Sequence, residues 1–187
     1  MRKLLHLLAA YALLIMAMAF TSAAFNWHDD IITQKVIRRT CKKTHLYSFC
    51  VKAVNHFPIQ YRYTKPLDVA QTLVQLLGWQ ANSMVLGIDR LIESLIKYRH
   101  TSFIASLHAC RDLYNKIYTV DYYIASDKLI SGNFKLAEQR MLMAYRRAQS
   151  CEYAFRRIGK TPYVFLKKNS QTCRLALVAA GAAHSLY

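Results

Sequence analysis

Acidic side chains are scarce in this sequence, which has ten Asp and Glu residues against 26 Lys and Arg residues among 187. A hydrolase would need paired carboxylates, a nucleophile beside a base, or a cluster of metal ligands. The acidic residues are spread thinly, and the pair Asp29 and Asp30 is most simply the negative first turn of a helix. The five glycines form no phosphate-binding loop. The sequence therefore predicts a binding protein rather than an enzyme, with no catalytic residue, metal or cofactor.

Histidine also lacks the partners that metal binding requires. No histidine in the main part of the chain has a Glu or Cys at metal-ligand spacing, so each is interpreted as a surface or packing residue. These residues are His45, His56, His100, His108 and His184.

Strand-like alternation of apolar and polar residues is absent over any useful length, and there is no internal repeat. Apolar residues instead recur at alternating spacings of three and four, which is typical of one face of an amphipathic helix. The segments with this pattern run from Val74 to Tyr98, from Phe103 to Ile117 and less regularly through Val120 and Ile124, from Phe134 to Phe155, and from Leu175 to Leu186. The pattern predicts an all-α fold, a four-helix up-and-down bundle.

Shorter segments precede the bundle. Residues 29–40 and 44–56 have the composition of two short helices, and residues 57–65 form a polar, aromatic linker. We expect an N-terminal helical hairpin that extends the bundle.

The first 24 residues have the features of a signal peptide. A charged start is followed by an apolar run from Leu4 to Phe20 and by small residues up to Ala24. A signal anchor is the alternative, but the run is short for a membrane span. We expect residues 1–24 to be removed and residues 25–187 to form one secreted domain, with no membrane contact after cleavage.

The formal net charge of +16 predicts attraction to polyanions or to acidic protein surfaces. Export argues against nucleic acid as the partner. Paired cations such as Arg146 and Arg147 are most simply solvated helix faces, and weak adhesion to an anionic matrix such as pectin is the functional alternative.

Five cysteines in an exported chain imply two disulfides and one residue left over. Cys41 and Cys50 are close enough in sequence to close a local loop. Cys110 and Cys151 are almost equally far from the turn signal Ser131-Gly132-Asn133, so antiparallel helices would bring them to the same height. Cys173 is a rival partner for Cys151, because the turn at Thr161-Pro162 lies midway between those two. Spacing alone leaves this choice open.

The chain resembles the plant invertase and pectin methylesterase inhibitor family over essentially the whole mature sequence. The residues that carry the resemblance are Thr40–Thr44 with Cys50, Cys110–Tyr114, Gly132–Glu138, and Ala148–Glu152 with Phe155. The resemblance implies a four-helix bundle with an N-terminal helical hairpin and disulfides Cys41–Cys50 and Cys110–Cys151. It also implies inhibition by docking into an enzyme's active-site cleft, and it leaves Cys173 free.

The resemblance further points to a docking turn. In invertase inhibitors of the family, a Pro-Lys-Phe tripeptide between the second and third bundle helices enters the sucrose pocket. The corresponding residues here are Phe134-Lys135-Leu136, which keep the lysine and replace its two neighbours. We therefore expect target contacts from Asn133, Phe134, Lys135 and Leu136. The alternative is that Phe134 is a core residue and Lys135 a solvated first-turn lysine.

The target follows from the same resemblance. The Gly132–Glu138 turn favours acid invertase of the cell wall or vacuole, and pectin methylesterase is the alternative. A secreted helical protein without inhibitory activity is the third candidate. The expected location is extracellular, in the apoplast or cell wall, with the vacuole as the other address on the secretory route.

Overall fold

A computed structural model describes residues 31–57, 63–95, 101–157 and 163–187, and within these ranges the protein is helical without strands. Residues 31–41 are helical. The labelled elements are α2 (Tyr47–Asn55), α3 (Pro66–Leu95), α4 (Thr101–Lys116), the π-helical turn η2 (Ile117–Tyr122), α5 (Tyr123–Ile130), α6 (Phe134–Arg156) and α7 (Tyr163–His184). The expected signal peptide, residues 1–24, lies outside the described residues.

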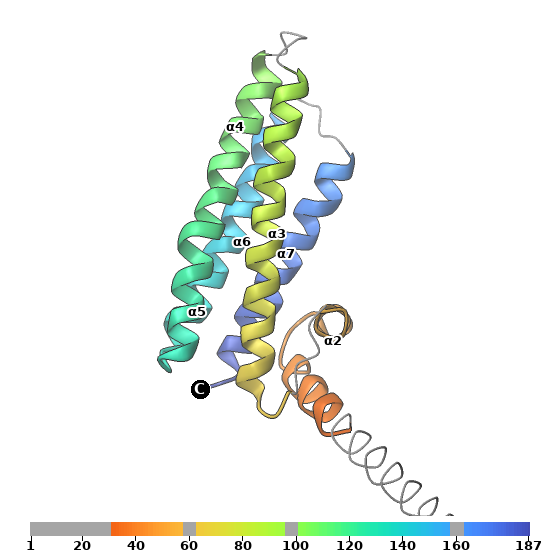
Figure 1. Ribbon diagram of the computed structural model, residues 1–187, viewed down its shortest axis with the longest axis vertical. Coiled ribbons are helices and arrows are strands. Elements are labelled where there is room, and N and C mark those ends of the chain that lie inside the picture. Colours follow the sequence, from red (N-terminus) through yellow and green to blue (C-terminus); the bar gives the residue numbers. More distant parts are fainter. Residues whose placement is uncertain (1–30, 58–62, 96–100, 158–162) are drawn as a thin grey trace, which may run out of the picture.

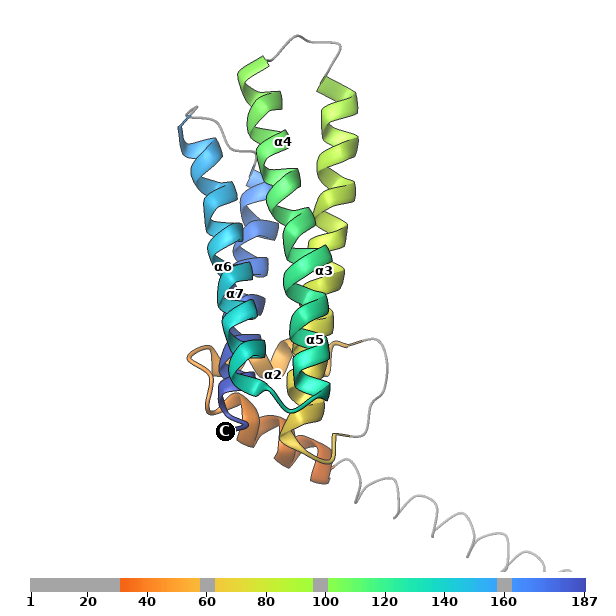
Figure 2. The same cartoon turned by 90° about the vertical axis from the view of Figure 1, so that its left-hand side faces the viewer.

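The long helices form the predicted up-and-down bundle (Figure 1). α4, η2 and α5 make one continuous rod, which packs against α3 and α6, and α7 closes the bundle by packing against α6 and α3. The helix of residues 31–41 and α2 lie at the lower end of the bundle, which is also the end of the C-terminus and of the α5–α6 turn (Figure 2). The all-α class and the helical extension at the N-terminal side are thereby confirmed.

α3 begins at Pro66, where the missing backbone N–H leaves no hydrogen bond unmade. Asp68 caps this end, because its Oδ2 accepts hydrogen bonds from the backbone N–H groups of Thr64 and Lys65 at 2.9 and 3.0 Å. The predicted apolar face is buried from Val74 to Ile88. Tyr98, the last residue of the predicted face, lies outside the described residues.

The rod of α4, η2 and α5 departs from the predicted register. Val120 and Ile124 are half-buried, whereas Asp121, Ala125 and Leu129 are fully buried. The π-helical turn adds a residue to one turn and rotates the following helix relative to the preceding one. At this turn the rod packs closely against α3, since a Cβ at Gly78 would lie 2.7 Å from Cδ2 of Tyr122.

α6 follows the predicted face closely, and its buried residues from Ala137 to Phe155 keep three-four spacing. Alanines on this helix meet a run of small residues on α7, of which Ala176, Ala179 and Ala183 are fully buried. Small side chains allow the two helix backbones to approach closely. None of the described helices is both long enough and apolar enough to cross a membrane.

Both predicted disulfides are present. Cys41 and Cys50 join the two helices of the N-terminal hairpin with Cα atoms 5.6 Å apart. Cys110 and Cys151 join α4 to α6 with Cα atoms 4.6 Å apart. Cys173 is a free, half-buried thiol on α7, so the rival pairing with Cys151 is wrong.

Candidate functional site

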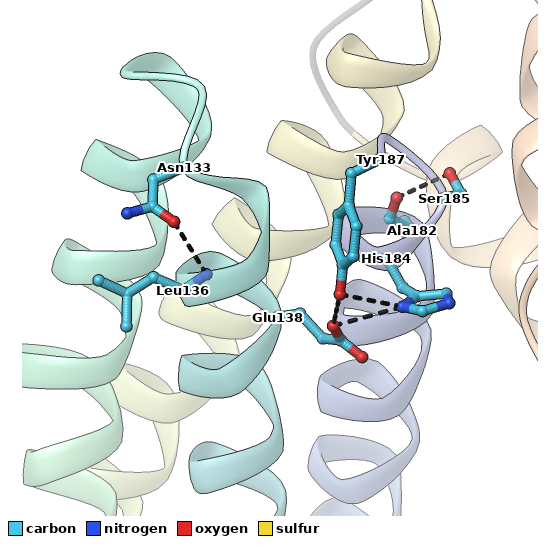
Figure 3. Close-up of polar contacts among 7 residues, drawn as sticks. All are labelled: Asn133, Leu136, Glu138, Ala182, His184, Ser185 and Tyr187. Atoms are coloured by element: carbon cyan, nitrogen blue, oxygen red, sulfur yellow. Dashed lines mark hydrogen bonds and ion pairs between the residues drawn. The ribbon is translucent and has the colours of Figure 1, made fainter.

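The α5–α6 turn has a defined backbone conformation. Gly132 has a φ of 78°, a left-handed value that residues with a side chain rarely adopt. Asn133 follows as the N-cap of α6, and its side-chain oxygen accepts a hydrogen bond from the backbone N–H of Leu136 at 3.3 Å (Figure 3). The pair Gly132-Asn133 therefore ends one helix and starts the next within a short, ordered turn.

The residues expected at the docking turn differ in their surroundings. Asn133 is exposed, but its side-chain oxygen is engaged in capping the helix. Phe134 is half-buried and packs against the hydrophobic core, as the packing alternative predicted for it. Lys135 is exposed, and no ion pair involves it within the described part of the chain. Leu136 is half-buried at the edge of a groove. Lys135 is the member of this set that the turn presents to solvent as a charge.

The groove next to Leu136 runs along α6 and has a volume of about 410 Å³. Its lining combines apolar side chains with two arginines: Leu136, Gln139, Arg140, Leu142, Met143 and Arg146. Sequence reasoning treated this side of α6 only as a solvated face. Arg146 lies opposite the buried face of α6, whereas Arg140 borders that face, three residues after Ala137.

A buried carboxylate lies behind this groove. Asp121 in η2 is fully buried, and its Oδ2 forms an ion pair with the Arg147 guanidinium. Arg140 is the second cation, with Nη1 4.0 Å from Oδ1. Burial raises the pKa of Asp121, and the hydrogen bond and charge of Arg147 oppose this effect. The cluster fixes α6 against η2 and orients Arg140, one of the two arginines of the groove.

Another polar cluster holds the start of α6 to the end of α7 (Figure 3). The Tyr187 hydroxyl donates a hydrogen bond to Oε2 of Glu138, and His184 Nδ1 lies 3.4 Å from the same oxygen. The hydrogen bond to Glu138 raises the pKa of Tyr187. Lys43 in the N-terminal hairpin donates to the backbone oxygen of Ser185 at 3.1 Å. These contacts connect the hairpin, α7 and α6 one turn beyond Lys135.

The middle of the bundle contains a buried network that sequence reasoning did not find. The Tyr114 hydroxyl donates to Oδ1 of Asn169 at 2.6 Å, and both side chains are fully buried. Asn169 approaches Glu152, which pairs with Arg156. Burial raises the pKa of the neighbouring Cys173 thiol to about 11, so this cysteine remains protonated at neutral pH. The network links α4, α6 and α7 near the Cys110–Cys151 disulfide.

The polar clusters in the described ranges join acidic side chains to cations, hydroxyl groups and amides. No group of three or more His, Cys, Asp and Glu side chains there could hold a metal ion. The acidic residues of the two clusters are engaged with Arg147 and with the C-terminal residues. At the α5–α6 end of the bundle, the exposed Lys135 lies beside the groove that Arg140 and Arg146 help to line.

Known proteins share this architecture. Comparison with the crystal structure of a pectin methylesterase inhibitor from Arabidopsis thaliana gives a TM-score of 0.60 at 18% sequence identity, over 81% of this chain and 95% of that one. Comparison with the crystal structure of mutant form A of a pectin methylesterase inhibitor from Arabidopsis gives a TM-score of 0.66 at 17% sequence identity, over 77% of this chain and 92% of that one. At these identities the likeness shows the fold alone.

A comparison with curated proteins returned no match. The model of the family described as plant invertase/pectin methylesterase inhibitor matches residues 35–179, which include both disulfides, the α5–α6 turn and all of α6. The chain belongs to the plant invertase/pectin methylesterase inhibitor family.

Proposed function

We propose that this protein is a secreted inhibitor that lowers the activity of an acid invertase by stoichiometric docking into its active-site cleft. The observation that carries the proposal is the exposure of Lys135 on an ordered turn at one end of the bundle. The expected partner is an enzyme of the cell wall or vacuole, reached by the secretory route after removal of residues 1–24.

The chemistry is that of a cation delivered to an acidic pocket. Glycoside hydrolysis uses a pair of carboxyl groups, so the cleft of such an enzyme is negatively charged. An ammonium group between those carboxylates forms charge-assisted hydrogen bonds and keeps substrate out. The net charge of +16 favours the encounter, since complementary potentials raise association rates.

Rigidity of the turn supports the same proposal. Affinity falls when a loop must be ordered on binding, and a preorganised loop avoids that cost. Gly132 and the Asn133 cap set the backbone, and the Cys110–Cys151 disulfide joins the two helix rods that the turn connects. The hydrogen bonds of Glu138 with Tyr187 and His184 attach the first turns of α6 to the end of α7.

Pectin methylesterase is the alternative target, and the groove along α6 is the observation that favours it. A cleft that binds a long polysaccharide is open at both ends, and a helix face covers such a cleft better than a turn does. Arg140 and Arg146 lie on this face together with Met143. Under this alternative, the contacts move from Lys135 to the two arginines.

The deciding experiment measures inhibition of an acid invertase and of a plant pectin methylesterase by the purified, oxidised protein. Lys135→Ala tests the turn and Arg146→Ala tests the helix face. Lys116→Ala is the matched control, because it removes another exposed lysine at a distance from the turn. Inhibition of invertase that is weakened by Lys135→Ala alone supports the main proposal. Inhibition of the esterase alone, weakened by Arg146→Ala, supports the alternative. Failure to inhibit either enzyme supports a role without inhibition.

A further inference from the structure

A second groove lies between α3 and α7, on helices that do not form the α5–α6 turn. It has a volume of about 280 Å³, and polar and apolar groups both line it. Nothing in the proposed inhibitory mechanism uses this groove. Its side chains nonetheless combine a flat aromatic surface, neutral hydrogen-bonding groups and free cations.

Trp79 supplies the aromatic surface. The residue is 41% exposed, so part of the indole is accessible to a ligand. Phe57 stacks on the indole with ring centroids 5.0 Å apart and an angle of 13° between the planes. The stack fixes the ring while part of it stays open to the groove. A rigid, exposed indole offers a flat apolar surface to the C–H face of a sugar ring at little entropic cost.

Neutral polar groups follow on the same face of α3. Asn82 and Ser83 lie three and four residues after Trp79, so the helix places them one turn further along the groove. The Asn82 amide can both donate and accept hydrogen bonds, as can the Ser83 hydroxyl. Gly87 keeps the next turn open, because a Cβ added there would have no atom within 4 Å. This stretch suits a ligand that carries several hydroxyl groups.

Two cations complete the groove. Arg90 lies at the far end of the α3 lining, and Lys168 faces it from α7. Among the described residues, neither side chain forms an ion pair, and Asp89, which precedes Arg90, pairs with Arg111 instead. Two unpaired cations beside a polar surface favour a ligand that carries carboxylates.

We infer that this groove binds an acidic polysaccharide, with a sugar ring on Trp79 and uronic acid carboxylates at Arg90 and Lys168. Trp79 and Arg90 are eleven residues apart, which is about 16 Å along a helix. This length exceeds a single sugar ring, so the ligand is an oligomer that lies along α3. A neutral oligosaccharide would leave both cations without partners. Binding of this kind would retain the protein in an anionic matrix while the α5–α6 turn remains free.

The test is calorimetric titration of the purified, oxidised protein with a de-esterified oligogalacturonate at fixed ionic strength. The methyl-esterified oligomer and a neutral cello-oligosaccharide are the ligand controls. Trp79→Ala is expected to weaken binding about tenfold, and Arg90→Gln and Lys168→Gln about threefold to tenfold each. Arg39→Gln removes the same charge from an exposed position outside the groove and is expected to change the affinity less than about twofold.

The outcomes separate a specific site from general attraction. Equal weakening by Arg39→Gln and by the two groove substitutions would overturn the inference in favour of bulk electrostatics. Equal affinity for the methyl-esterified oligomer would overturn the assignment of a carboxylate ligand. Trp79→Tyr keeps an aromatic ring and is expected to recover most of the affinity, which guards against misfolding of the alanine variant. All groove variants are expected to inhibit the target enzyme as the parent does, so this inference and the inhibitory function fail separately.

Discussion

Replacement of Arg147 by methionine should destabilise the bundle strongly, because it leaves the Asp121 carboxylate buried without its main partner. Asp121 is fully buried, and its Oδ1 has no hydrogen-bond partner within the described part of the chain. Breaking a buried ion pair typically costs about 3–5 kcal/mol. Arg140 remains with Nη1 4.0 Å from Oδ1 and compensates part of the charge, so we expect a loss of about 3 kcal/mol. In a domain of this size, that loss lowers Tm by roughly 6–12 °C.

The destabilisation should depend on pH in a defined direction. Burial raises the pKa of Asp121 above its ordinary value, and removal of Arg147 raises it further. A carboxyl group with a raised pKa binds its proton more tightly in the folded state. Tighter proton binding by Asp121 stabilises the folded protein at pH values below the pKa of the unfolded state. This stabilisation is lost as the pH rises through the pKa of the folded state. The loss of unfolding free energy caused by Arg147→Met should therefore become smaller as pH falls from about 7 toward about 4.

Urea denaturation followed by circular dichroism measures this deficit at both pH values. Arg146→Met is the matched control, since the neighbouring arginine is exposed and its guanidinium lies 4.0 Å from the Met143 sulfur, with no carboxylate partner among the described residues. The control should change the free energy of unfolding by less than about 0.5 kcal/mol. A loss below about 1 kcal/mol for Arg147→Met at neutral pH, or a loss that grows on acidification, would show that Arg147 does not stabilise a buried Asp121 carboxylate.

Further substitutions test the turn, the helix contact and the free cysteine. Gly78→Ala should lower the free energy of unfolding by about 1–3 kcal/mol, because its Cβ would lie 2.7 Å from the Tyr122 ring. Gly87→Ala should stabilise α3 by up to about 1 kcal/mol, because its Cβ would have no atom within 4 Å. Thermal melts that rank the two variants the other way would contradict this packing. Asn133→Ala should lower the free energy of unfolding by about 1 kcal/mol and Asn133→Asp should restore it, and equal stability of the two would argue against the cap. Cys173, with a pKa near 11, should react with iodoacetamide at pH 8 at least about tenfold more slowly than an ordinary thiol, and alkylation at the ordinary rate would show that its burial is wrong.

Much of the fold could be predicted from the sequence, because its helices are amphipathic and their ends carry local signals. The third segment is the clearest case, since its buried residues from Ala137 to Phe155 lie where the spacing placed them. The π-helical turn could not be predicted, and the close contact that accompanies it joins Tyr122 to Gly78 on a different helix. Periodicity carries no information about such a contact. The buried Asp121 was missed for the same reason.

The candidate site was predictable in part. Gly132 and Asn133 show a helix end and a helix start directly in the sequence, and Lys135 follows at a position that faces solvent. The cluster of Glu138 with His184 and Tyr187 joins residues more than 40 positions apart, so only the packing of α7 against α6 reveals it. The groove between α3 and α7 depends in the same way on how the two helices are placed.

The proposed inhibition depends on entry of Lys135, on the α5–α6 turn, into an acidic active site. The most direct test is the inhibition constant of the oxidised protein and of Lys135→Ala against an acid invertase, measured from about pH 4 to about pH 7 with Lys116→Ala as control. We expect stoichiometric inhibition by the parent and by the control, and a loss of affinity of at least about tenfold for Lys135→Ala. Full inhibition by Lys135→Ala, or no inhibition by the parent, would contradict it.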